Sequence, residues 1–132
     1  MINKITALLL IFPLIMALNG CAALIIGGAA GALGAYAVSK DTIQGDTDKP
    51  YDSLWESAYL VAKMRGTIKV EDSLKGYIEL QTSSGKVWIR LIKLTGSTTR
   101  LRVSARQFKL PNITLAQDIF VKIMEQASEL SR

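Results

Sequence analysis

Few side chains in this sequence could do chemistry. The chain has no histidine and one cysteine, Cys21, so the commonest general base and metal ligand is missing. Two carboxylate pairs stand out, Asp46 with Asp48 and Glu71 with Asp72. We expect them to be solvated surface charges in polar surroundings, where nothing predicts the burial that raises a carboxyl pKa. The spacing of "DTIQGDTD" also departs from the calcium loop of EF-hands. We therefore expect no catalytic residue, no metal, no cofactor and no enzyme activity.

Cys21 is the one exception, because its context predicts covalent attachment. Lys4 precedes an uncharged apolar run from Ile5 to Leu18, which is typical of an export signal. A transmembrane anchor is the alternative, but Pro13 and the short run favour the signal, because a span needs roughly 18 or more apolar residues. The boundary "LNGC" resembles the lipobox of bacterial lipoproteins.

In that class the cysteine thiol is alkylated by diacylglycerol and the signal is cut off before it. The new amine is then acylated, with palmitate as a typical fatty acid. A lone cysteine also has no partner for an intrachain disulfide. We expect residues 1–20 to be removed and Cys21 to be lipidated. Ala22 after the cysteine is compatible with the outer membrane, facing the periplasm, in a diderm organism.

The charge balance favours anionic partners. The chain carries 16 Lys and Arg against 11 Asp and Glu, net +5, and removal of Lys4 with the signal leaves +4. A basic exported domain suits anionic lipid headgroups, an envelope protein or an envelope polymer. Nucleic acid is not expected outside the cytoplasm. The alternative is mild surface basicity with no partner.

We expect residues 21–39, which are rich in Gly and Ala, to form a segment next to the membrane. Gly27 and Gly31 stand four residues apart, a spacing that lets apolar helices approach closely in a membrane. Each glycine lowers helix propensity by about 1 kcal/mol relative to alanine. Three interpretations stay open: a helix in or against the membrane, which we favour, a self-associating glycine zipper, or a flexible tether.

The sequence predicts a folded domain over residues 40–132. Apolar residues at helical spacing predict a helix from Pro50 to Gly66, and a second helix near the C-terminus that Asn112 or Thr114 could cap. The run 41–46 is either a short edge strand or a linker, and alternation favours the strand. Four further strands follow in "TIKVED", "GYIELQT", "KVWIRLIKL" and "TTRLRVSA".

Turn signals predict how these strands pair. Ser84-Gly85 as a two-residue loop would place Leu80 opposite Ile89. A three-residue loop, Thr95–Ser97, would place Leu91 opposite Leu101, and it keeps the apolar side chains on one face. This arrangement places Glu79 beside Arg90 on the outer face as an exposed ion pair.

The same arrangement predicts a surface for contact on the outer face. Its candidate residues are Trp88, Arg90, Arg100 and Arg102, since an exposed tryptophan among cations suits a membrane interface or a protein contact. The alternative is that the C-terminal helix or a loop covers Trp88. Trp55, on the apolar stripe of the first helix, is expected in the core.

Together these elements predict an α+β fold of order β-α-β-β-β-β-α, in which two helices pack on one face of an antiparallel meander of four to five strands. The layout resembles a family of small uncharacterised bacterial lipoproteins, on the motifs "YDSLWESA", "GYIEL", "GKVWIRL" and "TRLRVS". In place of that family's short glycine loop, this chain has the longer "ARQFKLPN". The resemblance implies the α+β fold and an envelope location, and it implies no catalytic residue.

Three functions are therefore considered. The first is a non-catalytic, membrane-anchored envelope lipoprotein that acts through protein or polymer contacts. The second is a carrier that holds an apolar ligand or lipid in a cavity lined by Leu54, Ile78, Ile89 and Phe120. The third is a glycine-zipper protein that oligomerises through its leader.

Overall fold

The computed structural model describes residues 3–17 and 34–130. The first range contains helix α1 (Lys4–Ala17), which coincides with the apolar run expected in the export signal. Among the described helices, none has the length and apolar character needed to cross a membrane. Cys21, Gly27 and Gly31 lie outside the described residues.

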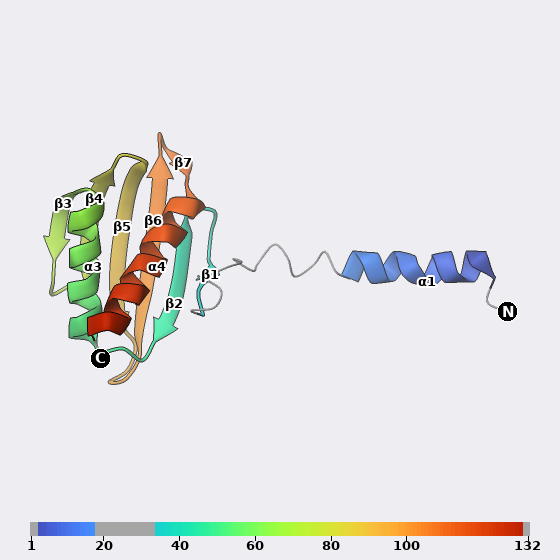
Figure 1. The fold of residues 1–132 in the computed structure, drawn as a ribbon, viewed down its shortest axis with the longest axis horizontal. Coiled ribbons are helices and arrows are strands. Elements are labelled where there is room, and N and C mark those ends of the chain that lie inside the picture. The colour runs from blue at the N-terminus through green and yellow to red at the C-terminus, as the bar shows by residue number, and fades with distance from the viewer. Residues whose placement is uncertain (1–2, 18–33, 131–132) are drawn as a thin grey trace.

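The second range forms one antiparallel sheet with two helices (Figure 1). In chain order its elements are β1 (Tyr36–Ala37), β2 (Thr42–Thr47), α3 (Tyr51–Arg65), β3 (Thr67–Asp72), β4 (Tyr77–Thr82), β5 (Gly85–Lys93), β6 (Thr99–Gln107), β7 (Leu110–Pro111) and α4 (Ile113–Leu130). The α+β fold is confirmed, but four to five strands was too low a count. The sheet has seven, because two-residue strands carry no periodicity that a sequence pattern could reveal.

The strand order across the sheet is β1-β2-β6-β5-β4-β3, with β7 paired to the end of β6. Helix α3 carries the chain from β2 to the far edge, and the meander β3–β6 then returns until β6 pairs with β2. The run 41–46 is thus a strand, as expected, but it lies inside the sheet and not at its edge. The sheet also begins before Lys40, because β1 pairs with β2 and Ala35 is buried in the core.

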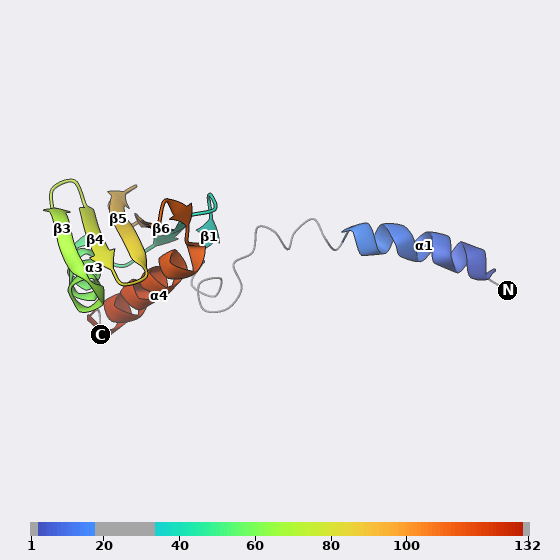
Figure 2. The same cartoon turned by 90° about the horizontal axis from the view of Figure 1, so that it is seen from above.

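Both helices cover the same face of the sheet (Figure 2). Helix α4 packs on β2 and β6, α3 packs on β3, β4 and β5, and the two helices contact each other. The core between them is fully buried, with Leu54 and Phe120 from the helices meeting Ile78, Ile89 and Val103 from the sheet. Trp55 packs against this core while staying partly exposed. Neither α3 nor α4 covers the other face of the sheet.

The predicted pairing of β5 with β6 is confirmed, with Leu91 opposite Leu101 and Ile89 opposite Val103. The pairing of β4 with β5 is off by two residues, because Leu80 lies opposite Val87 and not opposite Ile89. The loop is Ser83-Ser84, and Gly85 belongs to the strand. A Cβ on Gly85 would lie 2.4 Å from the carbonyl oxygen of Arg106, so β6 comes too close to tolerate a side chain there. A shift of two keeps every side chain on its predicted face.

Candidate functional site

The uncovered side of the sheet, which we call the open face, is dominated by basic side chains from its two central strands. These are Lys86 and Arg90 on β5, and Arg100, Arg102 and Arg106 on β6. Their neighbours along each strand, such as Ile89 and Leu101, are fully buried on the opposite side. The strict two-residue alternation of a strand therefore places apolar residues toward the helices and cations toward the open face.

Three of these five cations are neutralised by carboxylates. Arg100 donates to both oxygens of Asp46, from Nε at 2.8 Å and from Nη2 at 3.2 Å. Arg106 Nε donates to Asp41 Oδ2 at 2.7 Å, and Lys86 pairs with Glu79. Hydrogen bonding to Arg100 lowers the pKa of Asp46, and hydrogen bonding to Lys86 lowers the pKa of Glu79. All three carboxylates are thus held in their charged form.

Arg90 and Arg102 have no such counterion. They lie directly opposite each other on β5 and β6, and neither forms an ion pair with a carboxylate in the described part of the chain. Arg102 Nε donates to the Gln44 side-chain oxygen at 3.0 Å. Arg90 lies over the Tyr77 ring, 5.5 Å from its centroid. Like charges directly opposite each other on a sheet repel, and neither the Gln44 contact nor the Tyr77 contact neutralises the charge of its arginine.

The two arginines border a shallow hollow of about 300 Å³, which we call the arginine hollow. Tyr77, Trp88 and Ser104 complete it, and the Asp41–Arg106 ion pair closes one side. Planar guanidinium groups with free N–H donors match carboxylate and phosphate oxygens, often with two parallel hydrogen bonds. Burial raises the pKa of Tyr77, whose hydroxyl donates to Glu79. The hollow therefore presents donors and aromatic surface suited to an anionic group.

The structure brings three of the four predicted surface residues together in this hollow. Trp88, Arg90 and Arg102 line it. Arg100 lies two residues before Arg102 on β6, outside the hollow, and forms an ion pair with Asp46. Trp88 is partly exposed, and neither α3 nor α4 covers it, because both pack on the opposite face. Lys86 lies over the Trp88 ring, 5.5 Å from its centroid.

The predicted Glu79–Arg90 ion pair was wrong. Glu79 lies opposite Trp88 and pairs with Lys86, because the true pairing of β4 with β5 is shifted by two residues. The shift moves Tyr77 beside Arg90. Sequence reasoning also missed Ser104 and Arg106. Their alternate positions on β6 could have revealed that they share a face with Arg102. The pattern could not have revealed that Asp41, 65 residues earlier in the chain, pairs with Arg106.

Outside the open face, little in the described residues could do chemistry. No group of three or more histidine, cysteine, aspartate or glutamate side chains lies close enough there to hold a metal ion. The residues expected to line a carrier cavity, Leu54, Ile78, Ile89 and Phe120, are almost completely buried in the core. None of them lines any of five surface hollows found among the described residues.

The fold and the hollow define a class of protein: a small α+β domain with two helices on one face of its sheet and a cationic, aromatic surface on the other. Residues 4–108 match the family described as "Protein of unknown function (DUF3568)". The match covers most of the chain, from α1 to the end of β6, and the chain belongs to this family. Among curated proteins, no relative matches the chain.

Proposed function

We propose that this protein is a non-catalytic envelope lipoprotein, anchored through a lipidated Cys21, whose open face binds an anionic group on an envelope protein or polymer. The observation that carries the binding role is the Arg90–Arg102 pair, which lies on an uncovered sheet face without a counterion in the described residues. Two opposed arginines lower the stability of the free sheet and favour an anion that bridges them.

The anchoring role is supported by the sequence around Cys21. The apolar run before it, the "LNGC" boundary and the absence of a second cysteine together favour lipidation over a disulfide or a catalytic thiol. Several acyl chains on one residue hold a protein stably at a membrane, whereas a single chain does not. In a diderm organism, Ala22 favours the outer membrane, with the domain facing the periplasm. Self-association through Gly27 and Gly31 is compatible with this role.

Metabolic labelling with a fatty acid tests the anchor. We expect the wild-type chain to incorporate label and to lose residues 1–20, and Cys21→Ser to remain an unlabelled, uncut precursor. Normal labelling of the Cys21→Ser variant would overturn the anchoring role.

Affinity capture from crosslinked membranes tests the binding role. We expect Arg90→Gln with Arg102→Gln to lose a partner that the wild type retains, and we expect salt to weaken capture of that partner. The matched control is Lys63→Gln with Lys122→Gln, which removes two positive charges from the helical side of the domain. The binding role is refuted when the arginine variant and the control capture the same partners as the wild type.

A further inference from the structure

The turn between β6 and β7 has an unusual conformation for its residues. Gln107 pairs with Leu110, so Phe108 and Lys109 form a two-residue hairpin loop. Both have positive φ, 51° at Phe108 and 68° at Lys109. Such turns usually contain asparagine or glycine, because a positive φ brings a bulky side chain against its own backbone. A phenylalanine here is conformationally strained. We call Phe108, Lys109 and Leu110 the hairpin tip.

The hairpin tip is also apolar and exposed. The Phe108 side chain is 90% exposed and Leu110 is 68% exposed, so neither adds to the core. The backbone strain at Phe108 costs stability, and no burial of its ring offsets that cost. Observed strain of this kind is common where a segment serves binding and not stability. Exposed apolar surface of this kind is typical of a contact with a protein or a membrane.

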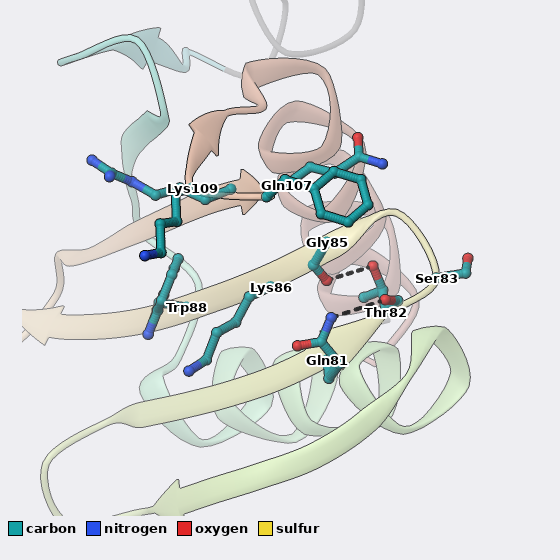
Figure 3. Close-up of a pocket in the computed structure, with 10 residues that line it drawn as sticks. Gln81, Thr82, Ser83, Gly85, Lys86, Trp88, Gln107 and Lys109 are labelled. Carbon is teal, nitrogen blue, oxygen red and sulfur yellow. Dashed lines mark hydrogen bonds between the residues drawn. The ribbon is translucent and has the colours of Figure 1, made fainter.

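The surroundings of the hairpin tip are cationic. Behind it lies a second hollow of about 390 Å³, which Lys86, Trp88 and Lys109 reach from two neighbouring hairpins (Figure 3). No acidic residue lines this hollow. Lys86 and Arg106 have carboxylate partners, but Lys109 forms no ion pair in the described part of the chain. The tip thus combines an apolar end with an uncompensated positive charge and a tryptophan close by.

We propose that the hairpin tip inserts into the interface of an anionic phospholipid bilayer. Phe108 and Leu110 would lie at the boundary between headgroups and acyl chains, and Lys109 would contact lipid phosphates. Apolar residues flanked by lysine, arginine and tryptophan are what binds in this region of a bilayer, and each basic residue near an anionic membrane adds to the attraction. Because Lys109 is positively charged, the tip favours an anionic bilayer over a neutral apolar surface.

The position of the hairpin tip leaves the arginine hollow accessible. The tip lies at the end of the strands, whereas the hollow lies along the side of the sheet on β5 and β6. A domain held by the tip would stand with its strands directed at the membrane, and its open face would remain in solvent. The membrane contact uses Phe108, Lys109 and Leu110 and neither of the unpaired arginines, although Trp88 and Arg106 border both hollows. It does not require lipidation of Cys21.

Quenching by brominated lipids tests this contact in the full chain, reconstituted into vesicles of phosphatidylcholine with or without phosphatidylglycerol. Trp55 and Trp88 are replaced by phenylalanine, and a single tryptophan is introduced by Phe108→Trp or, as the matched control, by Leu74→Trp. Leu74 is 97% exposed in the β3–β4 turn, which the alternation of antiparallel strands places at the opposite end of the sheet.

We expect quenching at position 108 to exceed that at position 74 several-fold. We also expect it to fall when phosphatidylglycerol is omitted or when Lys109→Gln is added. Equal quenching at the two positions, or quenching at 108 that ignores anionic lipid, would overturn the proposal.

A second measurement covers the case in which the tryptophan substitutions disturb the fold. In the unmodified chain, amide hydrogen exchange at residues 107–110 should slow in vesicles with phosphatidylglycerol relative to vesicles without it, while exchange at residues 73–76 stays the same. Protection of the tip that rises with protein concentration in detergent without phospholipid would assign the surface to a second copy and would overturn the bilayer contact.

Discussion

The Asp41 carboxylate ties the loop between β1 and β2 to β6, and its removal gives a quantitative test of the structure. The hydroxyls of Ser39 and Thr42 donate to Asp41 Oδ1 at 2.7 and 2.8 Å, and Arg106 Nε donates to Oδ2 at 2.7 Å. These interactions lower the pKa of Asp41 from 3.8 to about 2, with the Ser39 hydrogen bond as the largest cause, followed by that from Thr42. All three donors favour the charged carboxylate.

This shift corresponds to a stability contribution of order 2 kcal/mol, since one pKa unit is worth about 1.4 kcal/mol. Arg106 is half exposed, and solvent screens its share. We therefore expect Asp41→Asn to lower the free energy of unfolding at pH 7 by about 1 to 2 kcal/mol. The folded pKa lies below the unfolded one. The contribution is thus complete above the unfolded pKa and disappears as the pH falls through about 4 to about 2.

Urea unfolding of the full chain in mild detergent, followed by tryptophan fluorescence, measures this difference. The exposed Asp48, changed to asparagine, is the matched control. Wild type and Asp41→Asn should differ at pH 7 and converge as the pH approaches about 2. A difference at pH 7 no larger than that of Asp48→Asn, or one that stays constant down to the lowest pH, would refute the assignment of stability to this carboxylate.

Three further outcomes follow from the packing and charge of the domain. Gly45→Ala should lower the free energy of unfolding by about 1 to 3 kcal/mol, because the new Cβ would lie 2.9 Å from Phe120 Cζ. Adding Phe120→Leu should recover part of this loss. Full additivity of the two substitutions in a double-mutant cycle would contradict the clash. Asn112→Ala should cost about 1 kcal/mol, because Asn112 Oδ1 accepts from the Leu115 amide at 3.1 Å, and Thr114→Ala, measured by the same urea unfolding, should cost less. Arg90→Gln should raise the stability of the unbound protein by a few tenths of a kcal/mol, and the gain should shrink as salt is added; a loss of stability would show that the arginine pair supports the fold.

The sequence determined the elements whose signal is local. Helices α3 and α4 follow from apolar residues at helical spacing, and the faces of β4, β5 and β6 follow from alternation, which a shift of two residues leaves unchanged. The three-residue loop at Thr95–Ser97 also followed, because the alternative would have turned apolar residues to solvent. These features depend on neighbours within one turn or one hairpin, so the pattern of side chains carries them.

Only the tertiary structure decided what meets across the sheet. The position of β2 beside β6 places Gln44 against Arg102 and Asp41 against Arg106, pairs separated by 58 and 65 residues, and no local pattern encodes them. The true register of β4 and β5 has Ser83-Ser84 as its loop and Gly85 in the strand, close to β6. This register took Glu79 away from Arg90. The residue types predicted a basic outer face. Contacts between strands that are distant in sequence decided which of its cations lack a carboxylate partner. The arginine hollow is cationic for that reason, because the carboxylates that pair with Arg100, Arg106 and Lys86 form no ion pair with Arg90 or Arg102 in the described residues.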